Sequence, residues 1–253
     1  MAEIADMAEW DLRRQPNQLA SLSNELRAWA LQSGVELYGV ADLTPAMDFV
    51  VAQGGQFLAR FPRAISIGMP VLKAMVEPLG DRDNTAAATH YHYHIYEIIN
   101  RQLNATALGL GNRLEREGYQ AYVVPASVVY DKARLAGLFS HKLAAHLAGH
   151  GFIGKACLLV NPRFGGRVRY ATVLTDAPLP ANDPGEGSCG DCVACVEACP
   201  PHAFTGVEFR PEDPREVRFK AELCDRYMEH REKTVGRRVC GQCVLACDGS
   251  AHK

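Results

Sequence analysis

Cysteines near the end of the chain carry the most specific chemistry in the sequence. The chain has nine cysteines, and eight of them lie between Cys189 and Cys247. The first four stand in the run CGDCVACVEACP, with two, two and three residues between successive cysteines and Pro200 after the last. Thiolates are soft ligands that suit iron–sulfur clusters and zinc. This spacing is typical of bacterial ferredoxins, in which the fourth cysteine binds a second cluster, so the run predicts electron transfer.

A second group of cysteines supplies the remaining ligands. Cys240, Cys243 and Cys247 follow a C-x2-C-x3-C pattern, and Cys224 stands alone sixteen residues before Cys240. Exchange of the fourth ligand predicts two [4Fe-4S] clusters. Their predicted ligands are Cys189, Cys192, Cys195 and Cys247 for one cluster, and Cys199, Cys224, Cys240 and Cys243 for the other. Two zinc sites are the alternative, but zinc motifs are usually paired C-x2-C knuckles separated by a longer insert. We expect the ninth cysteine, Cys157, to be a buried thiol without a metal.

Length and charge limit the class of protein. The 253 residues suffice for one large domain plus a small module. With a formal net charge of -2, the chain as a whole is not attracted electrostatically to nucleic acid or to an anionic membrane. Arg13 and Arg14 form a twin arginine, but no apolar segment follows it and no apolar run reaches the length of a membrane span. We therefore expect a soluble, cytoplasmic protein that does not contact a membrane.

Strands and helices must position a ligand site ahead of the cysteines. Apolar periodicity predicts helices over 18–33, 87–118 and 139–148. Strands are predicted over 35–43, 63–71, 119–127, 156–162 and 167–176, followed by a linker rich in Pro, Gly and Asp over 177–187. The pattern predicts an α+β fold with a cofactor-binding α/β domain over 1–180 and a two-cluster module over 181–253.

The segment ahead of the linker resembles the epoxyqueuosine reductase family, which is related to the reductive dehalogenases. In that family a G-L-G-W-I-G-K loop precedes a strand, an N-P-x-x-G turn, a strand ending in L-T-D and a ferredoxin module. The matching residues here are Gly149, Gly151, Phe152, Ile153, Gly154 and Lys155 in the loop, Asn161, Pro162 and Gly165 in the turn, and Leu174, Thr175 and Asp176 at the strand end. The resemblance is specific from about 140 to 247.

The resemblance implies a nitroreductase- or flavin-reductase-like α/β sandwich followed by a bacterial-type two-[4Fe-4S] ferredoxin module. It implies an oxidoreductase whose clusters take electrons from a low-potential donor of the ferredoxin or flavodoxin type and pass them to cobalamin. In the type enzyme this chemistry removes an epoxide from a tRNA nucleoside. The residues expected to bind the cofactor are Ser140, Lys142, Gly149, Gly151, Phe152, Ile153, Gly154 and Lys155, because a glycine-rich loop lets the backbone approach a large ligand.

Two features depart from the family pattern. The family's proton donor is an aspartate in a D-x-A-P segment, and counting back from Gly149 places Leu135 there. Asp131 is the nearest carboxylate, and Tyr130 and His141 are the other candidate donors. The type enzyme also continues past its clusters with a region that helps to hold tRNA, whereas this sequence stops soon after the last cysteine and has no basic stripe. We therefore expect a short form for which tRNA is a doubtful partner and whose substrate is another nucleoside or a small molecule.

Other functions remain open on the sequence. The chain could be a non-catalytic electron-transfer protein that docks a corrinoid protein or a flavoprotein. FMN is the alternative cofactor, because the expected domain type resembles flavin enzymes. The alternating His90, His92 and His94 would share a face only in a strand, and the predicted helix brings only His90 and His94 together, so we expect no metal there.

Overall fold

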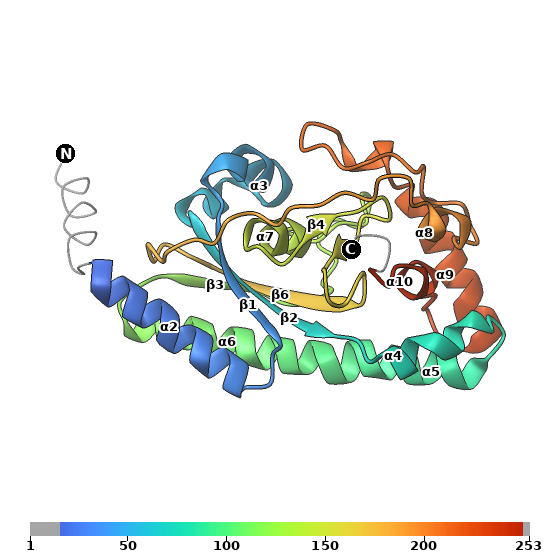
Figure 1. Cartoon of the computed structure of the whole chain (residues 1–253), viewed down its shortest axis with the longest axis horizontal. Helices are drawn as coiled ribbons and strands as arrows, with labels where there is room; N and C mark the ends of the chain where they lie inside the picture. Colours follow the sequence, from blue (N-terminus) through green and yellow to red (C-terminus); the bar gives the residue numbers. More distant parts are fainter. Residues whose placement is uncertain (1–15, 250–253) are drawn as a thin grey trace.

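A four-stranded antiparallel sheet forms the centre of the computed structural model, which describes residues 16–249 (Figure 1). The strand order is β1–β2–β6–β3, with every pair antiparallel. The strands are β1 (Leu37–Asp42), β2 (Arg63–Pro70), β3 (Ala121–Val124) and β6 (Val168–Thr175), and a separate hairpin pairs β4 (Phe152–Ile153) with β5 (Leu159–Val160). The twin arginine, Arg13 and Arg14, lies outside the described residues.

Helices surround the sheet and also build the cysteine-bearing end. They are α2 (Pro16–Gln32), α3 (Met47–Gly54), α4 (Lys73–Val76), α5 (Thr85–His92), α6 (Asn100–Arg116), α7 (His141–Leu147), α8 (Ala194–Glu197), α9 (Ala221–Val235) and α10 (Gln242–Ala246). The sequence did not predict α3 or α9, and the strand expected over 156–162 is only the short β5. Within residues 16–249, no helix is long and apolar enough to cross a membrane.

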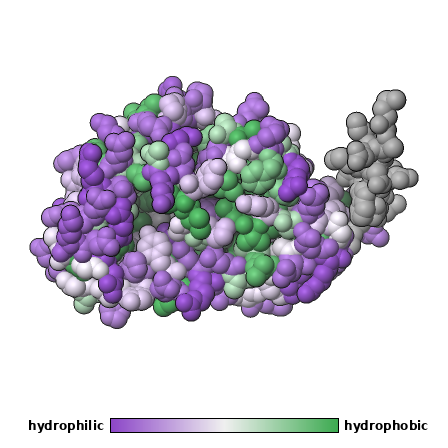
Figure 2. All heavy atoms as spheres, turned by 180° about the vertical axis from the view of Figure 1, so that it is seen from behind, coloured by the Kyte–Doolittle hydropathy of each residue, from purple (hydrophilic) through white to green (hydrophobic). Residues whose placement is uncertain are grey.

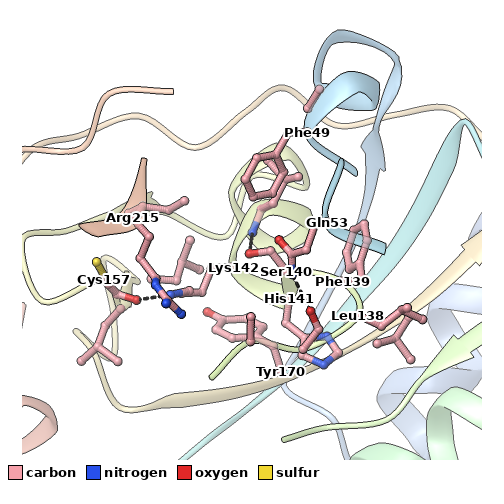
Figure 3. Close-up of a pocket in the computed structure, with 18 of the residues that line it drawn as sticks. Phe49, Gln53, Leu138, Phe139, Ser140, His141, Lys142, Cys157, Tyr170 and Arg215 are labelled. Atoms are coloured by element: carbon pink, nitrogen blue, oxygen red, sulfur yellow. Dashed lines mark hydrogen bonds between the residues drawn. The ribbon is translucent and has the colours of Figure 1, made fainter. Parts of the chain in front are cut away.

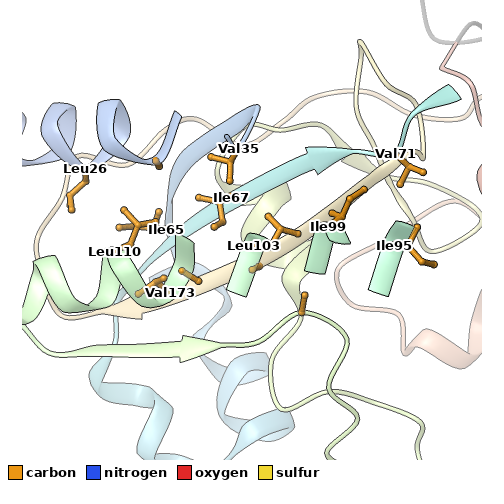
Figure 4. Packing of buried hydrophobic residues seen from close by; sticks show 14 of the residues in the cluster. Leu26, Val35, Ile65, Ile67, Val71, Ile95, Ile99, Leu103, Leu110 and Val173 are labelled. Atoms are coloured by element: carbon orange, nitrogen blue, oxygen red, sulfur yellow. The ribbon is translucent and has the colours of Figure 1, made fainter. Parts of the chain in front are cut away.

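The sheet lies between two helical layers because its strands carry apolar residues on both faces. Side chains alternate along a strand, so Ile65 and Ile67 point to one face and Ala64 to the other. Ile65 and Ile67 pack in one core cluster with residues of α2 and α6, as Figure 4 shows. Ala64 packs in a second cluster with residues of α3 and α7. Burial on both faces fixes the register, since a slip of one residue would exchange the two faces.

The long helix predicted over 87–118 exists, but it contains a π-helical segment over Tyr93–Ile99 between α5 and α6. It begins after Asn84, whose side chain accepts a hydrogen bond from the Ala87 amide at 2.9 Å. The extra residue per turn changes the helical facing that the sequence predicted for the histidines. Among residues 16–249, no group of three or more His, Cys, Asp or Glu side chains could hold a single metal ion, and that includes the histidine run.

The segment expected to be a linker is attached to the edge of the sheet. Asn182 lies beside the edge strand β1, where its amide donates to the Val40 carbonyl at 2.8 Å and its side chain accepts from the Val40 amide at 2.8 Å. The Gly185 amide donates to the His146 carbonyl at 2.8 Å. Composition alone suggested a free linker because it does not reveal that an unpaired strand edge is available for these bonds.

Candidate cofactor and cluster site

A cavity of about 1250 Å³ lies beside the sheet, and segments far apart in the sequence line it (Figure 3). The lining comes from α3, the 122–143 segment that ends in α7, the 153–170 segment and the 209–218 segment. Pockets for drug-sized ligands usually measure about 300–1,000 Å³, so this one suits a larger ligand. Phe49, Val128 and Val129 are exposed apolar residues of the lining. Figure 2 shows apolar side chains gathered around a hollow on the face opposite to that of Figure 1.

His141 lies in the cavity wall with both ring nitrogens engaged. Its Nδ1 is 2.8 Å from the Thr172 hydroxyl and its Nε2 is 3.2 Å from the Pro125 carbonyl. A carbonyl only accepts, so Nε2 carries the hydrogen and Nδ1 accepts from the hydroxyl. Burial lowers the pKa of His141 to about 4, which keeps the ring neutral at pH 7. His141 therefore positions the wall of the cavity and has no free nitrogen to offer a ligand.

The other two candidate proton donors lie on the neighbouring loop, and only one of them lines the cavity. Tyr130 does, and 62% of its surface is exposed. Asp131 is not part of the lining, and its carboxylate accepts from the Arg134 amide at 2.9 Å within the loop. Leu135, at the position counted back for the family's aspartate, lines the cavity with a positive φ of 49°. The position expected for the family's aspartate thus carries an apolar leucine whose backbone conformation is strained.

Of the eight residues expected to bind the cofactor, three line the cavity: Ser140, Lys142 and Ile153. The glycines of the loop instead face other parts of the chain. A Cβ on Gly151 would lie 2.0 Å from the Val160 carbonyl oxygen, and one on Gly154 would lie 3.0 Å from the Cys189 sulfur. The close approach that requires glycine here is between two parts of the chain, and a glycine pattern alone does not reveal which partner approaches.

Phe152, Gly149 and Lys155 are the remaining members of that loop. Phe152 packs against Cys189, and a Cβ on Gly149 would lie 2.9 Å from the Asp183 carbonyl oxygen. The Lys155 ammonium donates to the Gly190 carbonyl at 2.5 Å and to the Cys192 carbonyl at 3.2 Å. Phe152 and Lys155 therefore hold the first cysteine turn in place, and Ile153 is the residue of this loop that lines the cavity.

Lys155→Met tests this role of Lys155. The Lys155 side chain is 7% exposed and lies 3.8 Å from the Glu208 carboxylate, so its removal leaves two carbonyls and a half-buried acid without their partner. We expect a loss of about 1–3 kcal/mol of folding free energy, measured by denaturant unfolding of the metal-loaded protein. Lys220→Met, on an exposed lysine, is the matched control and should change stability little. Equal stabilities of the two variants would contradict this role.

The first set of cysteines lies directly behind the cavity wall. Burial raises the pKa of the Cys247 thiol to about 11, and the neighbouring thiols of Cys195, Cys189 and Cys192 raise it further. Gly166 lines the cavity and donates its amide to the Cys247 carbonyl at 2.8 Å. A Cβ on Gly166 would lie 3.5 Å from the Cys247 sulfur. The Gly166 backbone thus lies between the Cys247 sulfur and the cavity.

The second set of thiols lies beside α5, at the N-terminal end of the long helix. Burial raises the pKa of the Cys224 thiol to about 11, and Cys240 and Cys199 are the thiols that raise it next. Burial also raises the pKa of Cys243, followed by the effects of Cys240, Cys224 and Cys199. Cys195 of the first set also raises the pKa of Cys243, so the two sets lie close together, and their division between two clusters stays a prediction.

Much of the cavity wall comes from residues that no sequence motif marks. Gln53, Arg215 and Arg218 line the cavity together with Phe49. They come from α3 and from the segment between Cys199 and Cys224, and they belong to no motif. Only the fold brings them to Lys142, so a single sequence carried no signal for them.

Comparisons with known proteins agree with the resemblance that the motifs indicated. No family model matches the chain. The epoxyqueuosine reductase of Vibrio cholerae is 25% identical over 272 residues, which cover 89% of this chain and 66% of that protein. A structure of epoxyqueuosine reductase with an epoxyqueuosine-modified tRNA stem loop superimposes with a TM-score of 0.57 at 17% identity, covering 90% of this chain and 65% of the other. A reductive dehalogenase described as B12-dependent superimposes with a TM-score of 0.61 at 20% identity, covering 88% and 30%.

The resemblance to epoxyqueuosine reductases is thereby confirmed, and the mixed helix-and-sheet fold is theirs. The chain spans just under two thirds of the length of that curated relative. The expectation that tRNA is a doubtful partner finds no support, because one of the structural neighbours holds a tRNA stem loop.

Proposed function

We propose that the chain is a cobalamin-dependent iron–sulfur reductase of the epoxyqueuosine reductase type. In this proposal residues 1–180 form a nitroreductase-like cofactor domain and residues 181–253 a ferredoxin-like module. The observation that carries it is the contact between the two: Gly166 lines the large cavity, and a Cβ there would lie 3.5 Å from the Cys247 sulfur. A cluster held behind so thin a wall would deliver electrons to a ligand in the cavity.

The donor set fits two [4Fe-4S] clusters. Cys189, Cys192, Cys195 and Cys247 would hold the first, and Cys199, Cys224, Cys240 and Cys243 the second. Burial raises the pKa values of three thiols in each set, so metal binding would supply the positive charge that stabilises the thiolates. These thiols are Cys189, Cys195 and Cys247 in the first set and Cys224, Cys240 and Cys243 in the second. One zinc ion needs its sulfurs at about 2.3 Å, whereas a cubane distributes four thiolates over four irons. The ferredoxin-type spacing of the first four cysteines is therefore what favours cubanes over zinc.

The cavity fits a corrinoid better than FMN. Its volume of about 1250 Å³ exceeds what a drug-sized ligand fills. A corrinoid bound there would supply a metal centre able to reduce the substrate by electrons from the clusters. Ser140, Lys142 and Ile153 lie in the wall that would hold it, and neutral His141 keeps that wall in place through Thr172.

Tyr130 is our proposed proton donor, because it lines the cavity while Asp131 does not. We expect Tyr130→Phe to bind the corrinoid normally and to lower turnover by about 100-fold or more. The assay would follow reduction of an epoxyqueuosine-modified tRNA stem loop, with corrinoid binding measured separately by absorption. Asp131→Asn is the matched control and should retain wild-type turnover. Full activity of Tyr130→Phe would remove this residue from the proton transfer.

We propose a nucleoside in tRNA as the first substrate to test, since a structural neighbour holds an epoxyqueuosine-modified stem loop. A low-potential ferredoxin or flavodoxin in the cytoplasm would supply the electrons. Parallel titrations of the reconstituted protein with cobalamin and with FMN test the cofactor. We expect saturable binding of cobalamin alone. Binding of FMN in its place would make the protein a flavin reductase, and binding of neither would favour an electron-transfer protein that docks another cofactor carrier.

A further inference from the structure

One end of the cavity carries a cluster of three basic side chains, of which only one pairs with a carboxylate of the described residues. Lys142, Arg215 and Arg218 all line the cavity there, and Figure 3 shows Lys142 and Arg215 together beside Cys157. The Lys142 ammonium donates to the Cys157 carbonyl at 2.6 Å. Burial lowers the pKa of Lys142, and the nearby positive charges of Arg215 and Arg218 lower it further. Arg215 and Arg218 therefore lie close enough to Lys142 to act on its charge.

Arg218 is the most enclosed of the three. It is only 5% exposed, its guanidinium stacks on Phe209 at 4.7 Å, and one nitrogen donates to the Arg210 carbonyl at 3.3 Å. Its Nε has no hydrogen-bond partner although it is buried. An unsatisfied buried donor on a charged group is costly unless a ligand accepts from it.

Arg215 adds a second such donor. Its terminal nitrogens donate to the Leu135 carbonyl at 3.3 Å and the Arg134 carbonyl at 2.6 Å, and they pair with exposed Glu216 at 3.1 Å. The Arg215 Nε is buried without a partner.

The acids that the structure describes near this end pair with only one of the three basic side chains. Glu212, Asp213, Glu216 and Asp48 also line the cavity, and Glu216 pairs with Arg215. Among residues 16–249, however, neither Lys142 nor Arg218 forms an ion pair with any carboxylate. Buried charges are normally paired, so a missing anion is the simplest completion of this cluster.

We infer that Lys142, Arg215 and Arg218 form a subsite for a phosphate group at this end of the cavity. Guanidinium groups match the geometry of phosphate oxygens, and an ammonium adds a point charge. The inference deepens the proposed function and rests on it only for the source of the anion. That source is either the phosphodiester of the cobalamin nucleotide loop or a backbone phosphate of an RNA substrate, because both present the same oxygens.

Inorganic phosphate tests the subsite without any cofactor. The anaerobically reconstituted full chain is titrated with phosphate and followed by the phosphorus NMR line width. We expect saturable binding that weakens about tenfold or more in Lys142→Gln and in Arg218→Gln, because each variant removes a charge-assisted hydrogen bond. Lys132→Gln is the control: it removes the same charge from an exposed lysine of the neighbouring loop, outside the cavity lining, and should bind phosphate as the wild type does.

Iron content equal to that of the wild type confirms that each variant has folded. If Arg218→Gln loses iron, Lys142→Gln alone decides the result, because within the described part of the chain the Lys142 side chain is bonded to the wall only by its hydrogen bond to the Cys157 carbonyl. No saturable phosphate binding to the wild-type chain overturns the subsite. Affinities of Lys142→Gln within twofold of the wild type overturn it equally.

Binding measurements with cobinamide identify the source of the anion, because this corrinoid lacks the nucleotide loop and its phosphate. If the variants weaken cobalamin binding but leave cobinamide unchanged, the subsite serves the cofactor. If the variants bind both corrinoids as the wild type does but bind a tRNA stem loop more weakly, the subsite serves the substrate. Phosphate binding to a chain that takes up no corrinoid would leave the subsite in place and remove the proposed function instead.

Discussion

Cys195→Ala is expected to remove about one cluster, or roughly four of about eight irons. The Cys195 thiol lies in the set that backs the cavity, and burial raises its pKa before Cys189 and Cys192 add their effects. Loss of one ligand should release that cube and destabilise the cysteine turn, since metal binding contributes to folding. Iron and sulfide analysis of the anaerobically reconstituted protein measures the effect.

Cys157→Ala is the matched control for this result. Cys157 is the ninth cysteine and stands in neither thiol set, so the variant should keep its full iron content. Unchanged iron and sulfide in Cys195→Ala would overturn the ligand assignment. A loss of iron in Cys157→Ala of the same size would do so as well.

Gly165→Ala is expected to lose a similar amount of iron although it removes no ligand. Gly165 has a φ of 58°, and a Cβ there would lie 2.2 Å from the Cys247 carbonyl oxygen and 2.5 Å from the Asp248 carbonyl carbon. Backbone atoms cannot yield as a flexible side chain can, so the segment that carries Cys247 must move. The first cluster should then lose its fourth ligand.

Gly236→Ala separates this steric effect from the cost of the backbone conformation. Gly236 has a φ of 73°, but a Cβ there would meet nothing within 4 Å. Both variants bear the penalty of about 1–2 kcal/mol for a left-handed residue, and only Gly165→Ala meets the chain. We expect Gly236→Ala to retain its iron, and equal iron in the two variants would contradict the proposed role of Cys247.

The sequence predicted the elements whose signals are local. Alternation and apolar runs located β1, β2 and β6, and helical periodicity located α2 and α6. Cysteine spacing predicted two sets of thiols, because ligand spacing within one loop is itself a local property.

Long-range placement is what the sequence could not supply. The glycine loop before Lys155 was expected to hold a cofactor. Its glycines instead allow close contact with strand β5 and with the segment over 182–189. Arg215 and Arg218 reach the cavity from the cysteine-bearing segment, far along the chain from Lys142. Which chain segment approaches a glycine, or which charge meets a lysine, depends on tertiary packing rather than on periodicity.

The most direct test of the proposed function is the ratio of iron to cobalt in the protein. The chain would be purified without oxygen, reconstituted with iron and sulfide, incubated with cobalamin, freed of unbound cofactor and analysed for both metals. We expect about eight irons and one cobalt per chain, as two cubanes and one corrinoid require. Eight irons without cobalt would contradict a corrinoid in the cavity and leave a protein that only carries electrons or binds flavin.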